Sequence, residues 1–175
     1  YLDIQETDII LDGTIGFGGH SSAFLKKVSP KGRLIGLDQD PYAIQHCNTL
    51  FKDHKHVLLS QTNFEAFQTV LKKEAIPHIT KVLLDLGISS YQLDHANRGF
   101  SFQKDEKIDL RMNPTTLKKT GYWILNHYSA QQLSDLFYHY GELYKNKRLV
   151  HSILQSRKKH PINTTFQLIE LIKKS

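Results

Sequence analysis

Short apolar stretches alternate with helical patterns through the first half of the chain. Four stretches rich in Val, Ile and Leu predict strands, at residues 9–11, 34–37, 57–59 and 82–86. Three patterns between them predict helices, at about residues 21–28, 41–52 and 64–73. Asp40 followed by Pro41 is typical of a helix start, and Asn63 can cap the third helix. Continuous apolar strands with short connections predict an α/β fold, a doubly wound parallel sheet with helices on both faces.

The pattern changes after Ser90. A polar stretch at residues 91–119 is followed by helical periodicity alone. Helices are expected near residues 130–140, 142–159 and 165–174, and two capping boxes support them, Ser129 with Gln132 and Thr164 with Gln167. We therefore predict two domains, residues 1–92 and residues 93–175, the second a loop followed by a helical unit. A sheet of about four strands would leave an apolar edge uncovered, so we expect the chain to be part of a longer one.

Charge divides the chain in the same place. The net charge is +6, but residues 1–90 carry 9 Lys and Arg against 10 Asp and Glu, whereas residues 91–175 carry 14 against 7. The basic excess therefore lies in the second half. Such asymmetry favours a phosphate-rich partner for that half, although scattered lysines on solvated helix faces would give the same count.

A glycine-rich turn follows the first predicted strand, with glycines at positions 13, 16, 18 and 19. A strand, a glycine turn and a helix together are typical of a nucleotide-like ligand site, because bare backbone can approach the ligand closely. Ser21 stands where the dinucleotide fingerprint G-x-G-x-x-G has its third glycine, so a nicotinamide coenzyme is the weaker assignment. A sulfonium nucleoside has no pyrophosphate and tolerates the change. A tight structural turn is the plain alternative.

Four further residues are candidates for the same site, and each has a structural alternative. Asp38 ends the second predicted strand and can accept both ribose hydroxyls, or it can cap a helix. His20 can donate to a ligand carboxylate or be a surface histidine, and Phe64 can lie against an adenine or belong to the core. Asp85 ends the fourth strand, where it can orient an amino group or fix a loop.

Other chemistries find little support. The ten histidines form no H-E-x-x-H pattern, so no metal site is expected. Cys47 is the only cysteine, which excludes an internal disulfide and is typical of a small buried thiol in a reducing compartment. No apolar run reaches the roughly 18 to 20 residues that a membrane span needs, so a cytoplasmic location is expected.

Five motifs in order resemble a known family, at residues 11–21, 37–41, 84–94, 98–102 and 109–112. They look like the motifs of the RsmH (MraW) family, methyltransferases that use S-adenosylmethionine to methylate N4 of a cytidine in small-subunit ribosomal RNA. The resemblance implies a Rossmann-like methyltransferase sheet, with the helical unit as an insertion. It implies cofactor contacts at seven positions: Gly18, Gly19, His20, Asp38, Phe64, Asp85 and Gln92.

The resemblance also implies a mechanism and a partner. The exocyclic amine of cytidine is a weak nucleophile, so we expect positioning in line with the sulfonium methyl group to matter most, with Asp85 or a nearby carbonyl accepting an N4 hydrogen. The basic second half is expected to contact ribosomal RNA or the small subunit. Two alternatives stay open: a non-catalytic RNA-binding or ribosome-assembly module on the same fold, and a nicotinamide-dependent oxidoreductase.

Overall fold

Two compact units make up the chain. The computed structural model describes residues 2–94 and 97–175, and the units are Tyr1–Ser89 and Ser90–Ser175. The division lies three residues before the boundary predicted from the sequence. Among the described residues, no helix has both the length and the apolar character that crossing a membrane requires.

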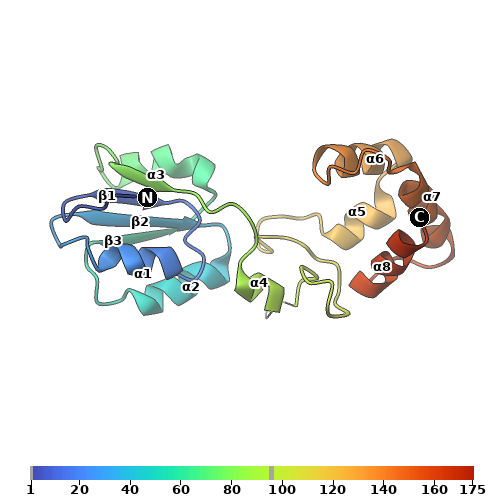
Figure 1. The fold of residues 1–175 in the computed structure, drawn as a ribbon, viewed down its shortest axis with the longest axis horizontal. Coiled ribbons are helices and arrows are strands. Elements are labelled where there is room, and N and C mark those ends of the chain that lie inside the picture. Colours follow the sequence, from blue (N-terminus) through green and yellow to red (C-terminus); the bar gives the residue numbers. More distant parts are fainter. Residues whose placement is uncertain (1, 95–96) are drawn as a thin grey trace. The chain divides into compact units, whose positions relative to one another are not determined.

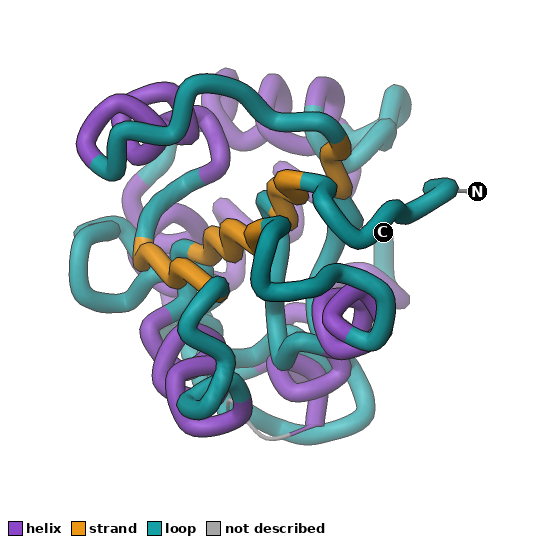
Figure 2. Tube along the Cα trace, turned by 90° about the vertical axis from the view of Figure 1, so that its left-hand side faces the viewer, coloured by secondary structure: helices purple, strands orange, loops and turns teal. Residues whose placement is uncertain are grey.

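The first unit is built on one parallel sheet. Its strands are β1 (Ile9–Asp12), β2 (Arg33–Asp38), β3 (Val57–Gln61) and β4 (Lys81–Leu83), in the spatial order β3-β2-β1-β4. Figure 2 shows the strands as a twisted row. The order reverses at β1, because β2 lies on one side of it and β4 on the other. A doubly wound sheet binds ligands at such a reversal, beyond the carboxyl ends of the strands.

Helices cover both faces of this sheet, as Figure 1 shows. On one face lie α1 (Gly19–Leu25) and α2 (Pro41–Leu50), and on the other lie the 3₁₀ turn η1 (Phe64–Ala66) and α3 (Phe67–Lys73). Neighbouring positions of β1 separate accordingly, since Ile10 packs with Phe24 of α1 whereas Leu11 packs in the cluster that contains Phe67 of α3. The predicted α/β fold with a doubly wound, Rossmann-like sheet is therefore confirmed.

One strand is shorter than the sequence predicts. A strand was expected over residues 82–86, but β4 ends at Leu83. In the described part of the chain, β4 pairs with β1 alone, and Val82 and Leu84 are 47% and 45% exposed. Beyond Leu83 the backbone turns to another partner, because the Asp85 N–H donates to the Thr14 hydroxyl at 2.7 Å. The apolar pattern continues past Leu83, but the backbone hydrogen bonding between β4 and β1 ends there.

The second unit is helical. Its helices are α4 (Ser90–Asp94), α5 (Gly121–His127), α6 (Ala130–His139), α7 (Lys147–Lys159) and α8 (Thr165–Lys173). The expected capping box at the start of α6 is present, because Ser129 and Gln132 each bond the other's backbone N–H. Ile108, Leu133 and Ile153 are at the centre of its core, each at most 2% exposed. Whether the unit is an insertion in a larger sheet stays a prediction.

Two helices of this unit depart from the predicted pattern. No helix was predicted at residues 121–127, where α5 forms with Thr120 as its cap. The helix expected from residue 142 begins instead at Lys147. Glu142 has a φ of +51°, a left-handed conformation that interrupts a helix, and this explains the later start.

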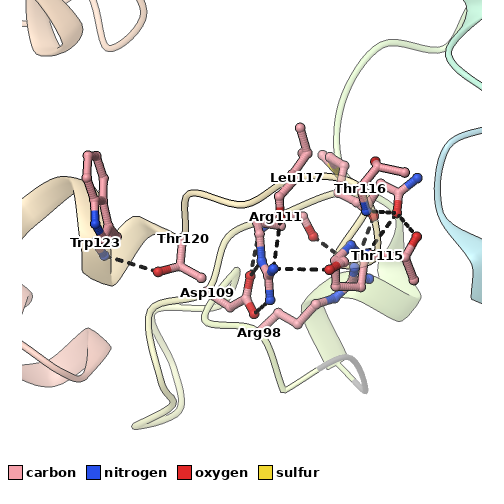
Figure 3. Close-up of polar contacts among 11 residues, drawn as sticks. Arg98, Asp109, Arg111, Thr115, Thr116, Leu117, Thr120 and Trp123 are labelled. Atoms are coloured by element: carbon pink, nitrogen blue, oxygen red, sulfur yellow. Dashed lines mark hydrogen bonds and ion pairs between the residues drawn. The ribbon is translucent and has the colours of Figure 1, made fainter.

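The later part of the polar stretch, residues 97–119, is an ordered loop before α5. Arg111 donates from Nε and Nη2 to the two carboxylate oxygens of Asp109, at 2.6 and 2.7 Å, and from Nη1 to the carbonyls of Pro114 and Leu117. Figure 3 shows Arg111 at the centre of these contacts, with Arg98 beside it. Arg98 donates to the carbonyl of Arg111 at 2.9 Å. These side-chain bonds act together with backbone bonds, such as that from the Asp109 N–H to the Arg98 carbonyl at 3.1 Å, to hold this segment in place.

Candidate functional site

The glycine turn joins β1 to α1 with two left-handed residues. Gly16 has a φ of +51° and Gly18 a φ of +79°, and Gly18 is the N-cap of α1. A Cβ on Gly18 would lie 2.8 Å from the ring of Phe51, so a larger residue there would be both strained and crowded. A Cβ on Gly19 would meet nothing within 4 Å. The turn thus has one side closed by packing and another side open.

Asp38 ties this turn to the end of β2. Its Oδ2 accepts the Gly16 N–H at 2.9 Å and its Oδ1 accepts the Asp40 N–H at 2.9 Å. Burial raises the pKa of Asp38, and these two backbone donors oppose the rise. A carboxylate has about four acceptor positions, so each oxygen can still accept one hydroxyl hydrogen. The half-buried Asp38 is therefore fitted to hold a vicinal diol beside bare backbone.

Asp12 is a second carboxylate at this edge, and it was not among the residues predicted for the site. It ends β1, is 1% exposed, and accepts the Ser21 hydroxyl at 2.7 Å. Burial raises its pKa, and the hydrogen bond from Ser21 lowers it in part. Ser21 is itself fully buried, so its side chain fills the place that a third glycine would leave empty. The sequence signal that could have identified Asp12 was its position, a carboxylate at the carboxyl end of the first strand.

His20 and Asp85 come together from different elements. His20 lies in the first turn of α1 and Asp85 follows β4, and His20 Nε2 is 3.4 Å from Asp85 Oδ2. Their side chains are 62% and 69% exposed, so the pair is open to solvent and contributes little to stability. Both groups remain accessible to a ligand at the carboxyl edge of the sheet.

Phe64 also lies beside the glycine turn. It begins η1 after the Asn63 cap, whose side-chain oxygen accepts the Glu65 N–H at 2.9 Å. A Cβ on Gly13 would be 3.1 Å from the Cβ of Phe64, and Phe64 is half-buried. Gln92 lies on α4 in the second unit, and its predicted cofactor contact stays a prediction.

Cys47 is a packed thiol beneath the turn. It is completely buried, its Sγ lies 3.3 Å from the Gly16 carbonyl oxygen, and burial raises its pKa to about 12. The expectation of a small buried thiol is confirmed, since a thiol with so high a pKa is not a nucleophile at neutral pH. The residues that the structure describes include no group of three or more metal-binding side chains.

Comparison with known proteins assigns the chain to a family. The model of the MraW methylase family matches residues 1–175. This chain belongs to the MraW methylase family. The resemblance seen in the sequence motifs is thereby confirmed, and the first of these motifs contains the glycine turn of this MraW-family chain.

Curated relatives agree with this assignment. A protein named ribosomal RNA small subunit methyltransferase H from Ureaplasma urealyticum is 43% identical over 172 residues, which are 98% of this chain and 56% of the relative. A protein of the same name from Clostridium botulinum strain 657 is 39% identical over 99% of this chain and 56% of the relative. The chain thus spans about half the length of the curated relatives it matches. Among solved structures, Aeropyrum pernix fibrillarin with natively bound S-adenosyl-L-methionine has a TM-score of 0.41 at 20% identity, covering 46% of this chain and 34% of fibrillarin.

Proposed function

We propose that this chain binds S-adenosylmethionine at the carboxyl edge of its sheet and serves methyl transfer to N4 of a cytidine in small-subunit ribosomal RNA. The curated relatives are named as methyltransferases of small-subunit ribosomal RNA, which supports the substrate class. The observation that carries the cofactor assignment is the Asp38 carboxylate, hydrogen-bonded to Gly16 within the glycine turn. Bare backbone and a diol acceptor side by side suit a nucleoside.

Each residue of the site has a proposed binding role. Asp38 accepts the ribose hydroxyls, and the backbone from Gly16 to Gly19 lies against the amino-acid end of the cofactor. Phe64 packs on the adenine, His20 donates to the cofactor's carboxylate, and Gln92 supplies a further contact. Ser21 fills the space that a dinucleotide site keeps free, which favours a sulfonium nucleoside over a nicotinamide coenzyme.

The bound cofactor supplies an electrophilic methyl group on its sulfonium. Asp85 stands at the edge where such a group would be presented, with its carboxylate exposed. We assign to Asp85 the acceptance of a hydrogen bond from N4, which orients the amine so that its lone pair faces the methyl carbon, and then of the proton that N4 loses once the methyl group has left the sulfur. His20, at 3.4 Å, steadies the Asp85 carboxylate in that position.

Binding of the cofactor is tested by calorimetry with S-adenosylhomocysteine and with NAD. We expect S-adenosylhomocysteine to bind and NAD to give no heat. Asp38→Asn should weaken binding by about tenfold or more, because charge-assisted hydrogen bonds to the ribose are lost. Asp53→Asn is the control, since Asp53 is exposed in the turn before β3, at the opposite edge of the sheet. Binding of NAD alone would overturn the cofactor assignment.

The chemical step is tested with labelled S-adenosylmethionine and small ribosomal subunits, in this chain and in a form extended to the length of its relatives. Asp85→Asn should lower turnover by about 10²-fold or more while leaving the Kd for S-adenosylhomocysteine within a few-fold. Unchanged turnover would remove Asp85 from the mechanism. Salt-sensitive binding to subunits without any transfer in either form would favour the non-catalytic RNA-binding module.

A further inference from the structure

A group of exposed aromatic and basic side chains lies at the end of α6, in the connection that follows and at the start of α7. We call it the α6–α7 patch, and it consists of Tyr138, His139, Tyr140, Tyr144, Lys145, Lys147 and Arg148. The tyrosines are 47%, 88% and 68% exposed in chain order. The ring centroids of Tyr138 and Tyr144 are 5.2 Å apart at 73°, and those of Tyr138 and His139 are 5.0 Å apart. Such exposure of large aromatic rings marks an interaction surface.

The backbone that carries the patch is fixed from beneath. Asn146 is 3% exposed, and its side chain accepts the Ser134 hydroxyl and donates to the carbonyls of Ser134 and Leu143, at 2.8 to 2.9 Å. The Leu143 N–H donates to the Phe137 carbonyl at 2.9 Å. The connection is thus bonded to α6 on both sides of its turn. Rings held on an ordered backbone lose little conformational entropy when they bind.

The charge of the patch indicates what kind of partner it binds. Residues 138–148 contain three Lys or Arg and a single acidic residue, Glu142. Helix α7 begins with two of these three, and its thirteen residues contain three more Lys or Arg near its end and no Asp or Glu. A surface that combines stacking rings with cations matches a strand whose bases are unpaired and whose backbone carries phosphates. A duplex would offer the phosphates but keep its base faces inside the stack.

We propose that the α6–α7 patch binds an unpaired segment of RNA, with bases stacked on Tyr140 and on the Tyr138–Tyr144 pair and with phosphates held by Lys145, Lys147 and Arg148. This deepens the proposed function and rests on it for the identity of the RNA. Every proposed cofactor residue except Gln92 lies in the first unit, whereas every residue of the patch lies in the second, and Gln92 is not part of the patch. Separate variants can therefore test the two sites.

The test measures anisotropy of a labelled, unstructured oligoribonucleotide of about ten nucleotides with the whole chain. Tyr140→Leu and Tyr144→Leu should each weaken binding by about fivefold or more, whereas Tyr140→Phe should bind as the parent does, because stacking needs only the ring. Phe166→Leu is the matched control, since Phe166 is a 44% exposed ring on α8 outside the patch. Lys145→Gln and Lys147→Gln should each reduce the slope of log K against log salt by about 0.7, and the tyrosine variants should leave the slope unchanged.

Several outcomes would overturn the proposal. One is that an RNA duplex binds as tightly as the single strand or more tightly, and another is that both tyrosine-to-leucine variants bind RNA as the parent does. A third is that an acidic peptide displaces the RNA and itself binds those variants more weakly, because this would indicate a protein partner. Calorimetry with S-adenosylhomocysteine on the same variants separates the two hypotheses. Loss of RNA affinity with unchanged cofactor binding supports the patch. Failure of the parent to bind the cofactor refutes the proposed function but leaves the RNA result standing.

Discussion

Two adjacent glycines in the turn have different tasks, and substitution separates them. Gly18→Ala should cost about 2–4 kcal/mol of unfolding free energy, because its φ is +79° and a Cβ would be 2.8 Å from the Phe51 ring. Gly19→Ala should change stability by less than about 0.5 kcal/mol, since a Cβ there meets open space, yet weaken S-adenosylhomocysteine at least about tenfold. Urea unfolding and calorimetry give the two quantities. Parent-like cofactor affinity in Gly19→Ala would show that the open side of the turn is not the ligand's.

The individual residues also show how much of the candidate site could be predicted from the sequence. Asp38 and the glycine turn follow a spacing whose physical reason is known, and Asp38 is indeed bonded to Gly16. The approach of His20 to Asp85 depends on how α1 and β4 are placed, which residue patterns do not specify. Asp12 escaped selection because its role appears only once Ser21 is seen to donate to it. Assignment of these residues to the cofactor stays a prediction until a ligand is bound.

At the scale of elements, the Asp109–Arg111 pair should hold the loop before α5. Asp109→Asn should cost about 1–2 kcal/mol at neutral pH, because the paired side chains are only 24% and 21% exposed and share two charge-assisted bonds. Arg111 holds the pKa of Asp109 below its usual value. The contribution is therefore complete above the ordinary pKa of an aspartate, about 4, and is lost as the pH falls through the lowered value.

The free energy of unfolding is measured in urea at several pH values, with the fluorescence of the single tryptophan, Trp123 on α5, as the signal. Glu170→Gln is the control, since Glu170 pairs with Lys173 at 3.2 Å while both side chains are more than half exposed, and it should change stability by less than about 0.5 kcal/mol. A cost of Asp109→Asn that matches this control, or that stays the same at pH 7 and at pH 3, would contradict the role given to the pair.

The sequence predicted a helix or strand correctly where one local signal was enough to identify it. Alternation of apolar strands and helices gave the α/β order, and capping residues gave the start of α6. The helix α5 was missed because seven residues give barely two turns of periodicity, and its capping residue, Thr120, directly follows a long polar stretch. The end of β4 was misplaced because a strand needs a hydrogen-bonding neighbour, and an apolar sequence does not show where that neighbour stops.

At the scale of the whole molecule, the hydrophobic packing and the net charge both change close to Ser90. The basic excess lies in residues 91–175, and the second compact unit begins at Ser90. Within the part of the chain that the structure describes, each hydrophobic cluster draws its members from one unit alone. The clusters of the first unit pack α1, α2 and α3 on the sheet, and that of the second packs α5 to α8 around Ile153. Separate cores allow each unit to open without the other.

A cofactor whose proposed contacts, apart from Gln92 on α4, all lie in the first unit should therefore stabilise the sheet and leave the core of α5 to α8 unchanged. At a free concentration about 100 times its Kd, S-adenosylhomocysteine should raise the opening free energy of amides in β1 and β2 by about 2.7 kcal/mol, because it binds only the folded unit. Amides in the middle of α6 and α7 should keep their exchange rates, and unfolding reported by Trp123 should keep its midpoint. Hydrogen exchange with mass spectrometry resolves the two sets of peptides. The Asp38→Asn chain serves as the control and should lose the protection in β1 and β2. If α6 and α7 gained protection equal to that of the sheet, the units would unfold as one, and the two-core interpretation would fail.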